Sequence, residues 1–213
     1  MANPVTLLLV GATGLVGRHV LEKALADPRV GRVVAPCRRA LAGHSRLSAP
    51  LVDFEQLPED VDWWRADAVI CTLGTTLRTA GSKDAFRRVD HDYPLAVARL
   101  ARSHGTPTYV LNSAIGAKAD SRIFYNRIKG ELEHDLRAEG FTSLVFVRPG
   151  VIDGHRDEFR LGERTLVSAL GAMAPLLPRR WRLNPAPSIA RELLEAAIQP
   201  VPGVSVVTSD CMA

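Results

Sequence analysis

The sequence has little of several features that mark membrane, secreted or metal-binding proteins. No apolar run approaches the roughly 20 residues that a membrane-spanning helix needs. The first residues, Met-Ala-Asn-Pro, lack the basic segment of a secretory signal. Only three cysteines occur, an odd number without metal-ligand spacing. These absences predict a protein that spans no membrane, binds no metal and works in the reducing cytoplasm.

Lysine and aromatic residues are also scarce, which bears on the expected partners. The net charge is +4, but only 4 of the 27 basic residues are lysines, and aromatic residues make up 6% of the chain. The arginines are scattered, without a long basic run or a basic patch interleaved with aromatic residues. Such a surface is not the footprint of a nucleic-acid-binding protein, so we expect no nucleic-acid partner.

What the sequence does contain is an alternation of short apolar runs and longer helical patterns. With 213 residues and 46% hydrophobic content, the chain suits one domain, expected to span residues 1–213. Near-continuous apolar strands alternating with helices predict an α/β fold, a doubly wound parallel sheet with helices on both faces. The expected strands are 5–10, 32–37, 50–53, 67–72, 108–112, 143–148 and about 204–207, and the expected helices are 15–26, 84–104, 122–139, 163–173 and 189–199.

Single residues refine the expected helix boundaries. Pro94 is expected to interrupt the helix in 84–104, because proline lacks an N–H and clashes with the preceding turn. Gly140 is placed to end the 122–139 helix in a left-handed conformation. Ser188 is expected to open the last helix.

The most informative stretch is GATGLVG at residues 11–17. The apolar run before it and the helical pattern after it place three glycines on a strand-to-helix turn, where backbone N–H groups can hold a pyrophosphate. Gly11 would make the tight turn, Gly14 would admit the phosphate, and Gly17 would let helix and strand pack closely. The alternative is a turn of small residues that binds nothing. The candidate cofactor-binding residues here are Gly11, Thr13, Gly14, Leu15, Val16 and Gly17.

Two arginines, Arg38 and Arg39, directly follow the predicted second strand. Proteins that prefer NAD usually carry an acidic residue near this point, which binds the ribose hydroxyls. No Asp or Glu lies between Asp27 and Asp53. Because guanidinium groups suit a ribose 2′-phosphate, NADP(H) is the expected cofactor. The alternative is two surface arginines in an arginine-rich chain.

Ser113, Tyr125 and Lys129 form the candidate catalytic set. Tyr125 and Lys129 lie four residues apart in a predicted helix, so they project from the same face. A lysine ammonium there favours the phenolate and prepares the tyrosine for proton transfer. Ser113 follows the 108–112 strand at the carboxyl edge, where ligands bind in open α/β sheets. Its hydroxyl could hold a substrate carbonyl while Tyr125 moves the proton.

Together these motifs resemble the short-chain dehydrogenase/reductase superfamily. Within it, the chain is most similar to atypical, short NAD(P)H-binding members such as the Tat-interacting oxidoreductase family, over about residues 5–160. The detailed matches are Leu73-Gly74-Thr75-Thr76, Arg88-Val89-Asp90-x-Asp92-Tyr93, Tyr125-x-x-x-Lys129-Gly130-Glu131 and Arg148-Pro149-Gly150-Val151.

The resemblance implies a doubly wound sheet that holds NADPH. Leu73, Gly74 and Thr75 would line the cofactor after the fourth strand, and the alternative there is a plain turn. Asp53 and Phe54 would lie near the adenine, although an aspartate and a core phenylalanine need no ligand.

The resemblance also bears on the substrate side of the site. Asp90 stands where many relatives carry an asparagine that completes a proton relay. Pro149 would pass the chain from the last long strand into the substrate region. Residues 151–213 would form a small substrate-pocket segment integrated with the domain. Since only about 60 residues follow Gly150, enclosure of a nucleotide-sugar is not expected.

Two functions are compatible with these observations. The first is NADPH-dependent reduction of a small carbonyl substrate, with Tyr125 as the general acid. The alternative is a regulatory protein that binds NADPH as a sensor and turns over little or no substrate. A monomer or small homo-oligomer is expected in either case.

Overall fold

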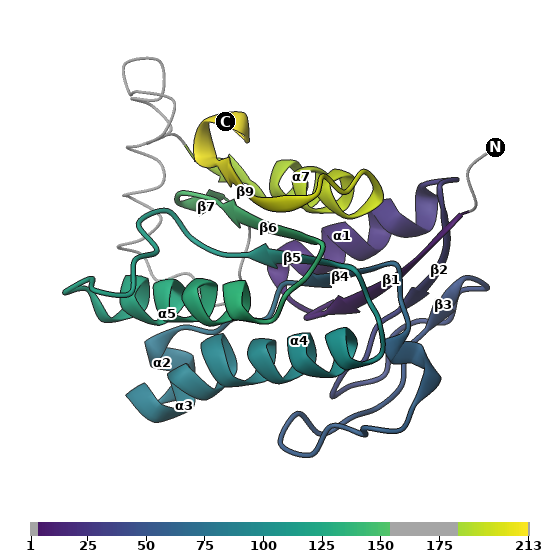
Figure 1. The fold of residues 1–213 in the computed structure, drawn as a ribbon, viewed down its shortest axis with the longest axis horizontal. Helices are drawn as coiled ribbons and strands as arrows, with labels where there is room; N and C mark the ends of the chain where they lie inside the picture. Colours follow the sequence, from purple (N-terminus) through teal and green to yellow (C-terminus); the bar gives the residue numbers. More distant parts are fainter. Residues whose placement is uncertain (1–3, 154–182, 213) are drawn as a thin grey trace.

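The computed structural model describes residues 4–153 and 183–212, and its centre is a seven-stranded parallel sheet (Figure 1). The strand order is β3-β2-β1-β4-β5-β6-β9, so the chain crosses over between β3 and β4 and then builds the second half outward. A two-stranded parallel ladder pairs β7 with β8. The strands are β1 (Val5–Val10), β2 (Val30–Val34), β3 (Leu47–Ser48), β4 (Ala68–Cys71), β5 (Thr108–Asn112), β6 (Ser143–Arg148), β7 (Ile152–Asp153), β8 (Asn184–Pro185) and β9 (Gly203–Thr208).

Helices cover both faces of the sheet (Figure 1). On one face α1 (Leu15–Ala26) packs against α7 (Ala186–Ile198), and on the other lie α4 (Tyr93–Ser103) and α5 (Phe124–Ala138). The remaining short elements are η1 (Asp62–Trp64), α2 (Leu77–Ala80), α3 (Lys83–Arg87), the π-helical turn η2 (Arg88–Asp92) and η4 (Ser209–Cys211).

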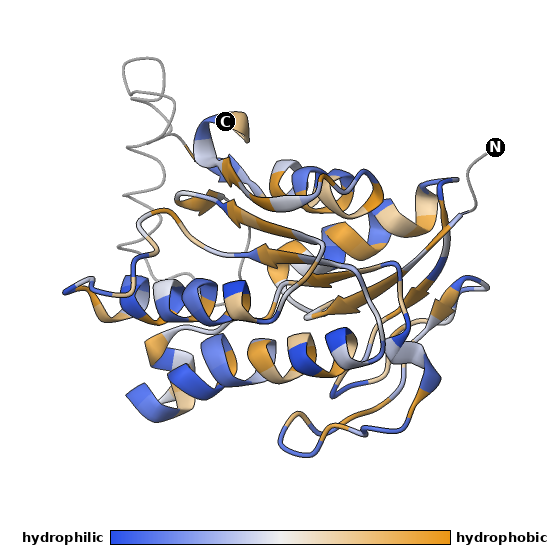
Figure 2. Ribbon diagram, in the orientation of Figure 1, coloured by the Kyte–Doolittle hydropathy of each residue, from blue (hydrophilic) through white to orange (hydrophobic). Residues whose placement is uncertain are grey.

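The strands are apolar because both of their faces are buried. Leu7 and Leu9 of β1 point into the core beneath α1 and α7, whereas Leu8 and Val10 point into the opposite core. Figure 2 shows the result as strongly hydrophobic central strands between helices whose outer faces are hydrophilic. This arrangement confirms the predicted doubly wound sheet, and the predicted strands 5–10, 108–112 and 143–148 match residue for residue.

The second and third strands are shorter and earlier than predicted. β2 ends at Val34, before Pro36, because proline has no N–H to donate to a sheet ladder. Only an isolated bridge between Cys37 and Leu51 continues the pairing. The predicted strand at 50–53 was therefore wrong, and β3 lies at Leu47–Ser48.

Two helix predictions can be compared with the structure, and one of them needs correction. The helix predicted at 84–104 is interrupted as expected: it runs as α3, then as the π-helical turn η2, and α-helical geometry restarts at Tyr93, next to Pro94, which has no N–H to donate. α7 begins at Ala186 after Pro185, so Ser188 lies inside the helix rather than at its start. Gly140 has φ +72° beyond the end of α5, which confirms the predicted left-handed position. The helix predicted at 163–173 lies outside the described residues.

Candidate functional site

The glycine turn lies at the carboxyl end of β1 and leads into α1. Gly11 has φ +87°, a conformation that side chains other than glycine rarely adopt. A Cβ at Gly17 would lie 2.0 Å from the carbonyl oxygen of Gly11, so only glycine permits this close helix–strand contact. Gly14 is the N-cap of α1 and supplies no side-chain hydrogen bond to the helix end. The turn thus presents uncapped backbone N–H groups at a positive helix terminus.

The residues after β2 and β3 divide into solvent-facing and packed groups. Arg38 and Arg39 are exposed, and within residues 4–153 and 183–212 neither forms an ion pair. Asp53 is exposed, and its Oδ1 accepts a hydrogen bond from the Glu55 N–H at 2.9 Å. The Phe54 side chain is buried against Tyr93, with ring centroids 5.7 Å apart. The phenylalanine side chain therefore serves the core, and the two arginines remain available to a ligand.

Tyr125 and Lys129 stand on the first two turns of α5 in different environments. Tyr125 is 38% exposed and packs edge-on against Phe86, with ring centroids 5.9 Å apart. Lys129 is only 3% exposed. Its ammonium lies 2.9 Å from Oδ1 of Asp90, which is buried on η2. A solvent-accessible phenol therefore precedes a buried cation by one helical turn.

Asp90 joins Lys129 to the loop after β4. Its Oδ2 accepts a hydrogen bond from the backbone N–H of Thr75 at 2.8 Å. A Cβ on Gly74 would come within 3.4 Å of Asp90 Oδ1 and 3.8 Å of Lys129 Nζ, so this loop lies against the ion pair. Thr72, just before the loop, also crowds Gly11 and Gly17. The glycine turn, the 73–75 loop and Lys129 therefore form one continuous region.

The charge of Lys129 follows from two opposing effects. Burial alone would lower the pKa of its ammonium, because a low-dielectric interior disfavours the charged form. The negative charge of Asp90 and the proximity of Tyr125 outweigh burial, so the pKa lies above its ordinary value. Lys129 is therefore a permanent cation at physiological pH.

Gly130, directly after Lys129, lets the loop that follows β5 approach α5. A Cβ at this position would lie 2.2 Å from the carbonyl carbon of Lys118. The Lys118 N–H also donates to the carbonyl oxygen of Asn126 at 3.1 Å. The sequence Tyr-x-x-x-Lys-Gly thus combines a phenol, a cation and a point of backbone contact on one helix.

Ser113 makes a contact that the sequence did not indicate. Its hydroxyl is buried and donates a 2.6 Å hydrogen bond to Oε1 of Glu133. Arg148 holds the same carboxylate through two further bonds, from Nε at 2.9 Å and from Nη2 at 2.5 Å. Because a serine hydroxyl donates one hydrogen, Ser113 must release Glu133 before it can hold a substrate carbonyl.

Two neighbouring residues were missed by the sequence interpretation. Glu133 lies four residues after Lys129, a spacing that places both on one helix face and could have pointed to it. Asn112, at the end of β5, has a buried Oδ1 without a hydrogen-bond partner among residues 4–153 and 183–212.

The predicted site residue Pro149 lies where the chain leaves β6. It is buried, and its carbonyl oxygen accepts a hydrogen bond from the Ile115 N–H at 2.8 Å, which connects the chain after β6 to the loop after β5.

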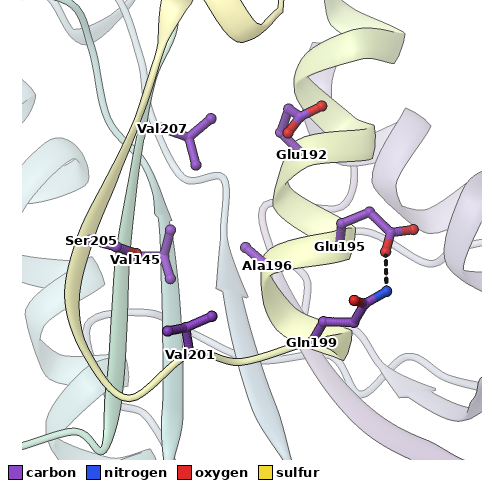
Figure 3. A pocket seen from close by; sticks show the side chains of 8 residues that line it. All are labelled: Val145, Glu192, Glu195, Ala196, Gln199, Val201, Ser205 and Val207. Atoms are coloured by element: carbon purple, nitrogen blue, oxygen red, sulfur yellow. Dashed lines mark hydrogen bonds between the residues drawn. The ribbon is translucent and has the colours of Figure 1, made fainter.

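A surface hollow elsewhere does not belong to this region. It has a volume of about 290 Å³ and lies between α7 and strands β6 and β9, next to the hydrogen-bonded pair Glu195 and Gln199 (Figure 3). α5, with Tyr125 and Lys129, covers the opposite face of the sheet (Figure 1). In the described part of the chain, no helix is long and apolar enough to cross a bilayer, and no cluster of His, Cys, Asp or Glu is arranged to hold a metal.

The doubly wound parallel sheet, the glycine turn after β1 and Tyr-x-x-x-Lys in the helix after β5 are features that this chain shares with the short-chain dehydrogenase/reductase class. Solved structures share the fold at low identity. MoeE5 in complex with UDP-glucose and NAD superposes with a TM-score of 0.72 and 18% identity, covering 94% of this chain and 74% of MoeE5. A short-chain dehydrogenase/reductase family oxidoreductase from Burkholderia thailandensis superposes with a TM-score of 0.67 and 18% identity. The match covers 99% of this chain and 93% of that oxidoreductase.

Curated relatives are much closer in sequence. "Protein fmp52, mitochondrial" of Emericella nidulans is 37% identical over 194 residues, covering 85% of this chain and 81% of the relative. Protein HTATIP2 of Rattus norvegicus is 32% identical over 206 residues, covering 93% of this chain and 83% of the relative. The chain belongs to the family of the fmp52 and HTATIP2 proteins. No family model matches the sequence.

These relatives contradict the predicted cytoplasmic location. The fungal fmp52 proteins, at 37% and 34% identity in two species, are named mitochondrial. The prediction rested on few, unpaired cysteines, which indicate a reducing environment but do not distinguish one reducing compartment from another.

Proposed function

We propose that the chain is an NADPH-dependent oxidoreductase that reduces a small carbonyl substrate, with Tyr125 as the general acid. The observation that carries the proposal is the pairing of an exposed Tyr125 with a buried, charged Lys129 one turn away. A positioned acid of this kind typically contributes about 10²–10⁴-fold to the rate. The glycine turn lies in the same continuous region, so a dinucleotide and a proton donor can meet there.

The residues around the glycine turn fit a nicotinamide dinucleotide. Gly17 permits the close helix contact, and the uncapped start of α1 offers N–H groups to a pyrophosphate. The structural neighbour MoeE5 is named as a complex with NAD. We assign the 2′-phosphate of NADPH to Arg38 and Arg39, which are exposed and without ion pairs among the described residues. The other proposed cofactor contacts are Gly11, Thr13, Gly14, Leu15, Val16, Asp53, the Phe54 backbone, Leu73, Gly74, Thr75, Tyr125, Lys129 and Pro149.

In this proposal, two residues of α5 have different chemical roles in the reduction. The bound cofactor supplies the hydride for the carbonyl carbon. Tyr125 donates its phenolic proton to the carbonyl oxygen, and the ammonium of Lys129 stabilises the phenolate that remains. Residues 151–213, within a single domain of 1–213, shape the pocket for the substrate. Ser113 joins the reaction only if its hydroxyl leaves Glu133.

A second candidate function is a regulatory protein that binds NADPH with little or no turnover. The contact between Ser113 and Glu133 favours it, because that hydroxyl is not free to hold a carbonyl. A sensor would need the glycine turn, the arginines and Lys129, but not the phenolic proton of Tyr125.

Calorimetric titration with NADPH and NADH tests the cofactor assignment. We expect NADPH to bind about 10- to 150-fold more tightly, since charge-assisted hydrogen bonds to the 2′-phosphate contribute about 1.5–3 kcal/mol. Replacing both Arg38 and Arg39 by Ala should remove most of that preference. Equal affinity for the two cofactors in the parent protein would refute the assignment. Turnover by the NADPH-loaded protein against aldehydes, ketones and quinones then separates the reductase from the sensor.

A further inference from the structure

A buried carboxylate lies where it can control the catalytic lysine. Asp90 is 1% exposed, and each of its oxygens lies close to a polar group of another element. Oδ2 accepts from the Thr75 N–H at 2.8 Å, and Oδ1 lies 2.9 Å from the Lys129 ammonium. One side chain thus connects the loop after β4 with the helix that carries Tyr125.

The irregular turn η2 explains how Asp90 reaches this position. π-helical turns are rare and occur often at functional sites, because the extra residue changes where side chains point. The turn Arg88–Asp92 buries two consecutive polar residues, Asp90 and His91. His91 contacts Asp135 of α5 at 3.0 Å and thereby fixes η2 against that helix. Asp90 is therefore held rigidly beside Lys129.

The charge balance around Lys129 depends on this one carboxylate. Among the residues that the structure describes, the ionisable groups that face its ammonium are Asp90 from η2, Tyr125 from α5 and Cys71 from β4. Cys71 is a buried thiol, and burial raises its pKa, so it stays uncharged. Tyr125 is 38% exposed, whereas Asp90 is buried with its carboxylate directly beside the ammonium. Asp90 is consequently the group that compensates the buried cation.

We propose that Asp90 is a positioning residue, whose carboxylate holds the Lys129 ammonium charged and against the 73–75 loop before the cofactor arrives. An asparagine at this position would still accept the Thr75 N–H bond but would supply no negative charge. The inference rests on the proposed cofactor role of Lys129, although the ion pair itself exists without a cofactor.

The first test measures NADPH affinity as a function of pH for the parent and for Asp90→Asn. In the parent, Lys129 keeps its proton, and affinity should vary by less than about two-fold between pH 7.5 and 9.5. In the variant, no negative charge opposes the effect of burial, so the pKa of Lys129 falls and the ammonium loses its proton at a lower pH than in the parent. Affinity should then fall about 10-fold or more, the effect of one charge-assisted hydrogen bond. Equal pH profiles for parent and variant would overturn the proposal.

Two controls identify the group that titrates. Repeating the measurement in a Tyr125→Phe background removes the phenol, and the pH effect of Asp90→Asn should persist there. Asp92→Asn is the matched substitution on the same turn; Asp92 is half exposed and contacts His91 and Arg87 instead of Lys129. It should leave the profile of the parent unchanged. A loss of the pH effect in the Tyr125→Phe background would assign it to the phenol and overturn the proposal.

The second test needs no cofactor. Thermal unfolding of Asp90→Asn, Lys129→Met and the double variant measures whether the two residues act together. Each single change leaves a buried charge without a partner, so both should lower the melting temperature. The double variant should recover much of the loss. Additive losses would overturn the ion-pair role even if NADPH binds, whereas a recovered double variant in a protein that binds no NADPH would refute only the proposed function.

Discussion

Tyr125 and Ser113 differ in what their hydroxyl groups contact, and this difference separates their roles. The Tyr125 side chain is 38% exposed beside a cation, whereas the Ser113 hydroxyl is buried and donates to Glu133. A proton donor must reach its substrate, so the tyrosine is the better candidate. The serine has the environment of a residue that fixes the carboxylate between β5, α5 and Arg148.

Tyr125→Phe tests the proposed acid directly. The change keeps the ring and its packing against Phe86 but deletes the proton that the substrate oxygen would receive. Turnover should fall about 10²–10⁴-fold, while NADPH affinity stays nearly constant. Steady-state kinetics on an active substrate, together with calorimetry, measures both. A variant that reduces every substrate at the parent rate would exclude Tyr125 as the acid.

Ser113→Ala should affect stability more than turnover. It removes a hydrogen bond to a buried carboxylate, for which a loss of about 1.5–3 kcal/mol in unfolding free energy is expected. The loss of turnover should be smaller than that of Tyr125→Phe. Denaturant unfolding and kinetics compare the two. If turnover falls as far as in Tyr125→Phe at unchanged stability, Ser113 instead releases Glu133 and holds the carbonyl.

At the scale of elements, α5 depends on a backbone contact that only glycine allows. Replacing glycine by alanine within a helix is ordinarily favourable by about 1 kcal/mol. At Gly130 the new Cβ would lie 2.2 Å from the Lys118 carbonyl carbon, and backbone atoms must move to relieve this overlap. Overpacking of this kind costs about 1–3 kcal/mol and should exceed the gain.

We therefore expect Gly130→Ala to lower the free energy of unfolding, as measured in urea. Gly43→Ala is the control, because nothing lies within 4 Å of its added Cβ. The control should change stability by no more than about 0.5 kcal/mol. A more stable Gly130→Ala protein would mean that the loop after β5 moves aside freely.

The sequence predicted the elements that are determined by neighbouring residues in the chain. β1 and β6 are predominantly apolar runs, and Gly140 is a local helix terminator, so the sequence predicted all three at their positions. Pro94 indicated where the helix restarts, because proline lacks an N–H, but the π-helical geometry of the turn before it was not predicted. The contacts of Asp90 and Glu133 join segments distant in sequence, and no periodicity encodes such pairs.

At the scale of the whole molecule, one arginine connects the segment after α1 with α7, which lie far apart in the sequence. Arg29, after α1, lies 2.7 Å from Oδ2 of Asp27 and 2.6 Å from Oε1 of Glu195 on α7. Hydrogen bonds from Arg29 lower the pKa of both carboxyl groups below their ordinary values. Carboxyl groups with a lowered folded-state pKa stabilise a protein above their unfolded-state pKa near 4. That stability is lost as the pH falls through the folded-state values.

Arg29→Met should accordingly lower the melting temperature at pH 7, and its difference from the parent should shrink as the pH falls from about 5 to 2. Thermal unfolding at several pH values measures this difference. Arg191→Met is the control, because Arg191 is exposed and pairs with its neighbour Glu192 on the same helix. A difference for Arg29→Met that stays constant with pH would show that the carboxyl groups do not depend on the arginine.

The packing of α1 against α7 has a consequence for the order of events during synthesis. The apolar residues Val16, Val20 and Ala24 of α1 share a core with Ile189 and Leu193 of α7. The ribosome makes α7 some 160 residues after α1, which at roughly 5–20 residues per second is a delay of about 10–30 s. During that interval, part of the first helix of the nascent chain has no partner for its apolar face. Until α7 has left the ribosome, the nascent chain therefore exposes apolar surface of α1 that can associate with other chains.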